Sequence, residues 1–122
     1  ILYAMYGFGD ASGTGFGSSI QSATGLSYRI GVWCGDEGEE TLNYWEFTNV
    51  IKALEEEGEA GRLADCRVFF CTDNSIVEAS IYKGSSSSEK LLALAVRFHC
   101  LHSRFGVLVL VSHVSGKRMI AE

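Results

Sequence analysis

Several features that define other protein classes are missing from this 122-residue chain. No apolar run approaches the ~18 residues needed to span a membrane, and no signal peptide is visible, so we expect neither a membrane protein nor a secreted one. No two cysteines form a Cys-x-x-Cys pair. We therefore expect Cys34, Cys66, Cys71 and Cys100 to be buried, reduced thiols, with no zinc site or disulfide framework, in an intracellular protein of the cytoplasm or nucleus.

Positive charge is also scarce, since 10 Lys and Arg face 15 Asp and Glu and leave a net charge of −5. Nucleic-acid-binding domains normally present a basic surface, so this balance is unusual for one. Part of the acidic excess is local, because one short run contains Glu55, Glu56, Glu57 and Glu59. Most of the basic residues, among them Lys83, Lys90, Arg97, Arg104, Lys117 and Arg118, lie in the second half of the chain, which leaves a basic side possible.

What is present is the composition of one folded domain, spanning residues 1–122 with 47% hydrophobic residues. Because the chain has no initiator methionine, we expect it to be a fragment of a longer polyprotein. Hydrophobic periodicity predicts strands at about 1–8, 16–22, 26–34, 68–71 and 107–111, and helices at about 42–59, 74–82 and 87–103.

The predicted order is β-β-β-α-β-α-α-β, with a further helix starting at the C-terminus. Short turns between the first three strands favour an antiparallel meander. The runs 68–71 and 107–111 are continuously apolar, which is typical of parallel strands covered on both faces. We therefore predict an α/β fold with a mixed five-stranded sheet, three antiparallel strands followed by parallel ones, and helices on both faces.

Three carboxylates fall where these elements can bring them together. Asp10 follows the first strand, Glu46 lies one turn into the helix 42–59 at the edge of its apolar face, and Asp73 ends the strand 68–71. Such a cluster repels itself unless cations neutralise it, so it indicates divalent metal ions. The alternative is that these are three ordinary surface acids.

Four motifs, in order, resemble the ribonuclease H domains of retroelement (retrotransposon-type) reverse transcriptases. They are a Gly-rich Asp-Ala-Ser hairpin over 9–17, Tyr44-Trp45-Glu46 on a helix, Thr72-Asp73-Asn74-Ser75 followed by Val77, and a His-Val-Ser-Gly-Lys step over 113–117. The resemblance covers nearly the whole chain. It implies the ribonuclease H-like fold and an endonuclease that cleaves the RNA strand of RNA–DNA hybrids during reverse transcription.

The resemblance also implies a site and partners. Family members use two Mg²⁺ ions, which Mn²⁺ can replace, held by four carboxylates; Asp10, Glu46 and Asp73 match three of them. The fourth is either Glu122 or a residue beyond it, and we expect a chain that stops short of it to be folded but poorly active. The implied partners are an RNA–DNA hybrid and an adjacent reverse transcriptase domain. Two departures are Ser115 in place of the usual proline, and His113, which precedes the family's mobile histidine position and is interpreted as structural.

Other interpretations remain open from the sequence. The glycines at 13–17 do not match the Walker phosphate-binding pattern, and tight hairpin geometry is the preferred explanation for them. An actin-like or sugar-kinase domain is a weaker possibility, since such proteins need two domains. His99 and His102 could form a metal pair, although packing is favoured. The functional alternatives are a non-catalytic ribonuclease H-like bridging or binding domain and a DNA-cutting transposase-type nuclease of the same fold.

Overall fold

The computed structural model describes residues 3–22, 25–33, 41–83 and 88–114. Its elements, in chain order, are β1 (Tyr3–Ala11), β2 (Gly15–Ser22), β3 (Gly25–Val32), α1 (Leu42–Glu59), β4 (Cys66–Thr72), α2 (Ser75–Lys83), α3 (Glu89–Phe105) and β5 (Leu108–His113). This is the predicted order. The further helix expected at the C-terminus falls outside the described residues.

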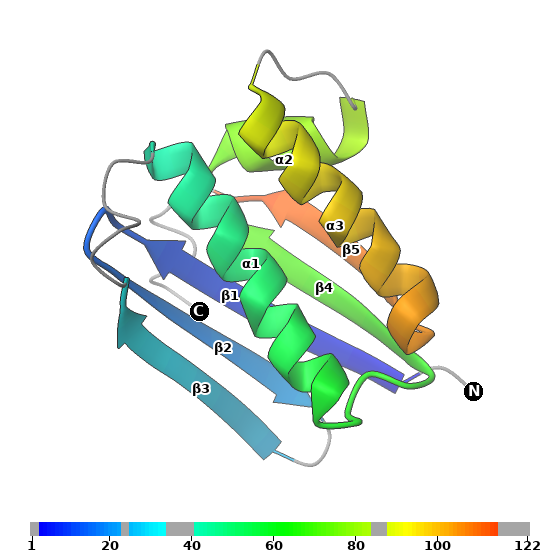
Figure 1. The fold of residues 1–122 in the computed structure, drawn as a ribbon. Coiled ribbons are helices and arrows are strands. Elements are labelled where there is room, and N and C mark those ends of the chain that lie inside the picture. The colour runs from blue at the N-terminus through cyan, green and yellow to red at the C-terminus, as the bar shows by residue number, and fades with distance from the viewer. Residues whose placement is uncertain (1–2, 23–24, 34–40, 84–87, 115–122) are drawn as a thin grey trace.

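The strands form one mixed sheet in the order β3-β2-β1-β4-β5 (Figure 1). β1 pairs antiparallel with β2, and β2 pairs antiparallel with β3. β4 runs parallel to both β1 and β5. The predicted five-stranded mixed sheet is confirmed, with β1 at its centre and the ends of β1 and β4 at the same edge.

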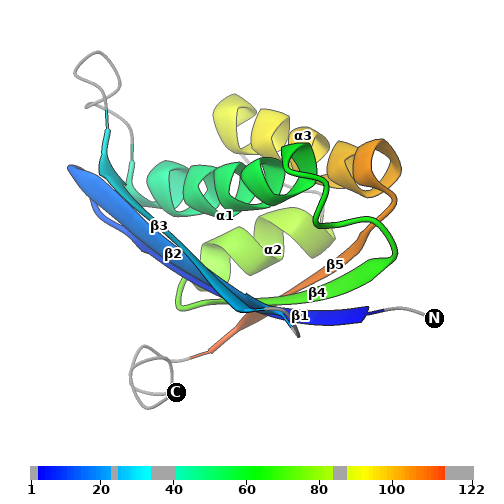
Figure 2. The same cartoon turned by 90° about the horizontal axis from the view of Figure 1, so that it is seen from below.

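The layer arrangement differs from the expectation of helices on both faces. Figure 2 shows α1, α2 and α3 all on the same side of the sheet. Burial along the strands agrees, because Val109 and Val111 are buried whereas their neighbours Leu108 and Leu110 are 43% and 37% exposed. Alternating side chains point to opposite faces of a strand, so a continuous apolar run need not be covered twice. Among the described residues, the second face has no helical cover.

The buried face of β1 contains two glycines. The larger apolar side chains at even positions, including the half-exposed Tyr6, lie on the open face, and Met5, Gly7 and Gly9 face the helices. A Cβ on Gly7 would lie 2.4 Å from the Phe70 ring. The glycines therefore let a large core side chain lie directly against the β1 backbone.

Helix boundaries follow from their caps. Thr41 caps α1, with its side chain accepting a hydrogen bond from the Tyr44 N–H, and the helix spans the predicted 42–59. α3 begins at Glu89, two residues later than the predicted start at about 87, and Ser88 caps it by accepting from the Leu91 N–H. The described helices include none long and apolar enough to cross a membrane.

The cysteine prediction holds only in part. Cys66, Cys71 and Cys100 are thiols, but Cys66 is buried, Cys71 is half-buried and Cys100 is exposed. Cys100 lies on the solvent side of α3, where an apolar neighbourhood in the sequence did not translate into burial. Cys34 lies outside the described residues.

Candidate metal centre

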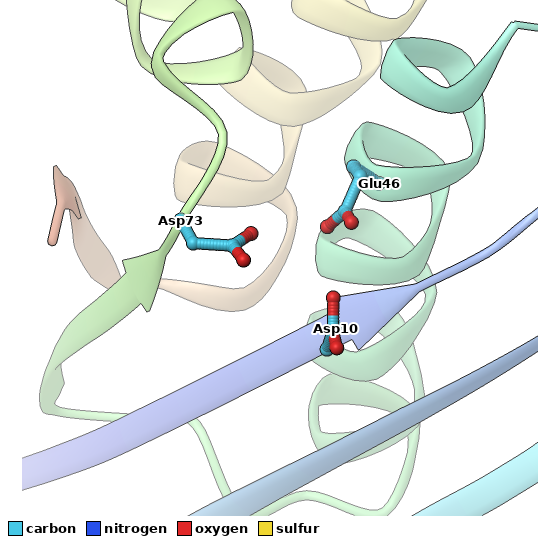
Figure 3. A group of neighbouring side chains, drawn as sticks. All are labelled: Asp10, Glu46 and Asp73. Atoms are coloured by element: carbon cyan, nitrogen blue, oxygen red, sulfur yellow. The ribbon is translucent and has the colours of Figure 1, made fainter. Parts of the chain in front are cut away.

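Three carboxylates from three different elements meet at one edge of the sheet. Asp10 is near the end of β1, Glu46 lies one turn into α1, and Asp73 directly follows β4. Figure 3 shows the three side chains pointing toward one another. One carboxylate oxygen from each lies within 4.8 Å of the others, well inside the separation that a shared metal site requires. The convergence predicted from the sequence is therefore confirmed as geometry.

Local hydrogen bonds hold Asp73 in its position. The Asn74 side-chain oxygen accepts from the N–H groups of Ile76 and Val77, which caps α2 directly after Asp73. The Asn74 amide also donates to Asn43 Oδ1 in the first turn of α1, at 2.9 Å. Because Asn43 lies one helical turn before Glu46, this contact ties the elements that carry Asp73 and Glu46 together.

Glu46 differs from its two partners in burial. It is 4% exposed, whereas Asp10 and Asp73 are exposed. Burial is the main cause that raises the pKa of Glu46 from 4.5 to about 8, opposed by the hydrogen bond from the Ala11 N–H and reinforced by the nearby charges of Asp10 and Asp73. That Ala11 N–H lies 3.3 Å from Glu46 Oε1. The metal-free site therefore holds more negative charge than its surroundings stabilise.

The donor set fits a hard divalent cation. All three groups are carboxylates, and Mg²⁺ takes carboxylate and water oxygens in preference to Cys or His ligands. None of the ion pairs found among the described residues involves Asp10, Glu46 or Asp73. A carboxyl group whose pKa is raised by burial and by neighbouring carboxylates is typical of functional sites. These residues would therefore accommodate Mg²⁺ or Mn²⁺.

A groove of about 750 Å³ opens beside Asp10, lined by residues of β1, β2 and β3 that include Phe8, Gly17, Tyr28 and Ile30. The turn between β1 and β2 borders it. In that turn the Ser12 hydroxyl accepts from the N–H groups of Thr14 and Gly15. This confirms hairpin geometry, and no Walker-type loop, for the glycine-rich segment.

None of the remaining sequence candidates belongs to the carboxylate cluster found among the described residues. Glu122 lies outside the described residues. His113 is exposed at the end of β5, where its N–H donates to the Glu78 carboxylate, and its structural role stays a prediction. His99 and His102 use their Nε2 atoms for the backbone carbonyls of Ile81 and Val109, so packing and hydrogen bonding are confirmed for them.

Asn49 is a residue of the site that the sequence analysis missed. It is fully buried, one helical turn after Glu46, and hydrogen-bonds the backbone of Asp10. The only signal for it was an asparagine next to the apolar face of a helix, a position where polar residues are uncommon.

Comparison with known proteins identifies the fold. No family model and no curated protein matches the chain. A ribonuclease H1 from the halophilic archaeon Halobacterium salinarum superimposes with a TM-score of 0.70 at 20% identity, covering 97% of this chain and 89% of that one. LC11-RNase H1 in complex with an RNA/DNA hybrid gives a TM-score of 0.71 at 19% identity, covering 95% and 87%.

A longer protein contains the same fold. The foamy viral protease–reverse transcriptase in complex with an RNA/DNA hybrid matches with a TM-score of 0.57 at 14% identity, covering 96% of this chain but 18% of that one. The chain therefore has the ribonuclease H fold. At these identities the likeness defines the architecture, and what the chain does must be argued from its own residues.

Proposed function

We propose that this chain is a metal-dependent endonuclease of the ribonuclease H type that cleaves the RNA strand of RNA–DNA hybrids. The observation that carries the proposal is the convergence of Asp10, Glu46 and Asp73 within 4.8 Å, on the fold of ribonucleases H. None of the ion pairs found among the described residues involves these three carboxylates. Two of the similar structures contain RNA/DNA hybrids, which supports the hybrid as the substrate class.

Each carboxylate would hold the ions in a different way. When bound, a pair of Mg²⁺ ions would supply an activated water and stabilise the leaving oxygen of the scissile phosphate. Asp10 and Asp73 are exposed and face the solvent from which a phosphate arrives. Glu46 approaches from the buried side, where the Ala11 N–H orients Oε1. The arrangement therefore places a fixed, buried ligand behind two accessible ones.

The biological setting belongs to the same proposal. Sequence motifs favour a retrotransposon-type reverse transcriptase as the parent chain, with 1–122 as its single ribonuclease H domain and an adjacent polymerase domain as partner. Thiols at Cys66 and Cys100 fit an intracellular setting. We further propose that Glu122, or a residue beyond it, completes the set of four carboxylates.

The test is cleavage of one labelled sequence as RNA–DNA hybrid, duplex DNA and duplex RNA, with Mg²⁺, Mn²⁺ or chelator. We expect cleavage of the hybrid's RNA strand only, abolished by Asp73→Asn, and weak, strongly salt-sensitive binding because the chain carries a net charge of −5. Equal cutting of duplex DNA would favour a transposase-type nuclease. Binding of the hybrid without metal-dependent cleavage would favour a non-catalytic domain.

Glu122→Gln tests the fourth carboxylate separately. If Glu122 is a ligand, its loss lowers cleavage in Mg²⁺ more than cleavage of the same hybrid in Mn²⁺, which tolerates a poorer ligand set. Activity that is unchanged by Glu122→Gln in both metals would show that the assignment to Glu122 is wrong.

A further inference from the structure

A buried polar chain connects the surface of β3 to the backbone of Asp10. Asn49 of α1 is fully buried. Its side-chain amide nitrogen donates to the carbonyl oxygens of Asp10, at 3.2 Å, and Gly17, at 3.0 Å. Its side-chain oxygen accepts from Arg29 Nη1 at 2.6 Å. One side chain of the helix thus holds two neighbouring strands of the sheet.

The orientation of the Asn49 amide is fixed by its partners. A guanidinium can only donate and a backbone carbonyl can only accept, so the oxygen must face Arg29 and the nitrogen must face the strands. Arg29 is itself held in place: its Nε lies 3.0 Å from Glu56 Oε2, and its guanidinium lies 4.0 Å from the centre of the Phe16 ring. The amide therefore cannot flip without leaving buried groups unpaired.

Asp10 needs such a contact because its strand is paired less completely there. The parallel pairing of β1 with β4 ends at Phe8 opposite Cys71, and Asp10 lies two residues further on. On the other side, Asp10 is opposite Gly17 of β2. Asn49 bonds both members of this pair. It links β1 to α1 at a point where β1 no longer pairs with β4.

The neighbouring glycine provides the room for this contact. A Cβ on Gly9 would lie 3.1 Å from Asn49 Nδ2 and 3.1 Å from the end of the Phe70 ring. The small residue before Asp10 therefore lets the Asn49 amide reach the strand backbone. Glu46 lies on the same helix face one turn earlier, so α1 holds the Asp10 backbone and presents a carboxylate to the Asp10 side chain.

We propose that Asn49, held by Arg29, is the positioning residue that sets the distance between the carboxylates of Asp10 and Glu46. It touches neither metal nor substrate, and it acts by fixing the Asp10 backbone relative to α1. The proposal rests on the proposed function insofar as the carboxylates bind cations, but the hydrogen-bond network it assigns exists in the metal-free protein.

Two variants remove the network at different points. Asn49→Leu keeps a similar volume and deletes the donors to Asp10 and Gly17. Arg29→Gln leaves Asn49 in place and deletes its anchor, which is the milder change if the leucine variant folds poorly. Arg62→Ala is the matched control, because Arg62 pairs with buried Glu57 near the other end of α1. It should cost stability without moving Asp10.

The first readout is the carbonyl ¹³C chemical shift of Asp10 and Gly17 in metal-free protein. Both should move toward non-hydrogen-bonded values in Asn49→Leu and stay unchanged in Arg62→Ala. The second is Mn²⁺ affinity by calorimetry with the metal alone. We expect a loss of about 10–100-fold in Asn49→Leu, as for outer partners of metal ligands, a smaller loss in Arg29→Gln, and none in Arg62→Ala.

Unchanged carbonyl shifts together with Mn²⁺ affinity within twofold of wild type in Asn49→Leu would overturn the proposal, even if the wild-type chain cleaves hybrids. An equal loss of affinity in Arg62→Ala would also overturn it, since the effect would then be general destabilisation. If the wild-type chain binds Mn²⁺ and shows these shifts but cleaves no hybrid, the proposed function fails and the positioning role of Asn49 stands.

Discussion

The glutamates at the two ends of α1 differ in whether they form ion pairs with arginines. In the C-terminal half, every glutamate forms an ion pair with an arginine. The pairs are Arg97–Glu55, Arg29–Glu56, Arg62–Glu57 and Arg104–Glu59. In the N-terminal half, Glu46 is buried beside Asp10 and Asp73, and none of the ion pairs in the described residues includes it. The same residue type on one helix is paired with arginine at one end and lies beside two other carboxylates at the other.

This difference shows that a count of charges does not locate function. The run 55–59 contains four glutamates, yet its charge is balanced by arginines from β3, α3 and the segment after α1. The three carboxylates of the site are far apart in the sequence, from Asp10 to Asp73. Among the described residues, the three carboxylates at the site are outside these ion pairs, so the net charge of −5 does not show where acidity is concentrated.

The largest effect should come from removing the charge at the unpaired end. Glu46→Gln should lower Mg²⁺-dependent hybrid cleavage by more than ~100-fold, beyond the range typical of outer-shell partners, because a direct ligand is lost. Glu55→Gln, on the same helix, should cleave within about twofold of wild type. Steady-state cleavage rates compare the two, and equal losses would erase the functional distinction between the ends of α1.

A pH titration of metal-free stability sharpens the same contrast. Since the pKa of Glu46 is about 8 in the fold and 4.5 in its absence, the folded protein keeps a proton that the unfolded chain releases. The stability that this proton contributes is therefore complete below about pH 4.5 and is lost as the pH rises through 8, with a slope of at most ~1.4 kcal/mol per pH unit. Urea denaturation with chelator, between pH 5 and 8, measures it.

Two variants test whether Glu46 causes this dependence of stability on pH. Glu46→Gln should remove the part of the slope of unfolding free energy against pH that Glu46 causes. Asp10→Asn should raise metal-free stability near pH 8 because it removes a like charge from the cluster. Glu55→Gln should leave the slope as in wild type. If Glu46→Gln keeps the full wild-type slope, Glu46 is ionised throughout and the site is not short of positive charge.

How far the sequence predicts this site can be seen along α1. The repeat of Tyr44, Phe47, Val50 and Leu54 predicts the helix and turns Glu46 toward the sheet, and the structure confirms both. Asn49 could not be found in the same way. Its role depends on the backbone carbonyls of Asp10 and Gly17, which are brought to it only by strand pairing.

The strands show the same limit. Periodicity predicts β1 and β4 to within a few residues. It does not identify the buried face of β1, because the larger apolar side chains lie at even positions and the buried face is the one with Gly7 and Gly9. Glycine has no hydrophobic signal of its own, and Phe70 from β4 fills the space it leaves. Likewise, the continuous apolar runs predicted helices on both faces of the sheet. That prediction is wrong for the described residues, because only alternate residues of β5 are buried.

The Arg62–Glu57 ion pair near the C-terminal end of α1 should contribute measurably to the free energy of unfolding. Arg62 donates to both oxygens of Glu57, at 2.6 and 3.0 Å, and the Glu57 side chain is 6% exposed. Arg62→Ala would leave a buried carboxylate unpaired, and since Arg62 is itself half-exposed we expect a loss of about 1–2 kcal/mol, less than the cost in a fully buried pair. Chemical denaturation at pH 7 measures it. Recovery in the double variant Arg62→Ala, Glu57→Gln would assign the loss to the unpaired charge.

The smallest effect is expected where both partners are exposed. Arg104 and Glu59 lie 3.3 Å apart with side chains 53% and 62% exposed, so water already stabilises each charge. Arg104 also lies 4.5 Å from the centre of the Phe105 ring, measured from Cζ. Glu59→Gln should therefore change the unfolding free energy by less than ~0.5 kcal/mol, and that change should disappear in 1 M salt, which screens an exposed pair. A loss as large as that of Arg62→Ala would show that burial does not set the strength of pairing along α1, and the graded contrast between its charges would have to be abandoned.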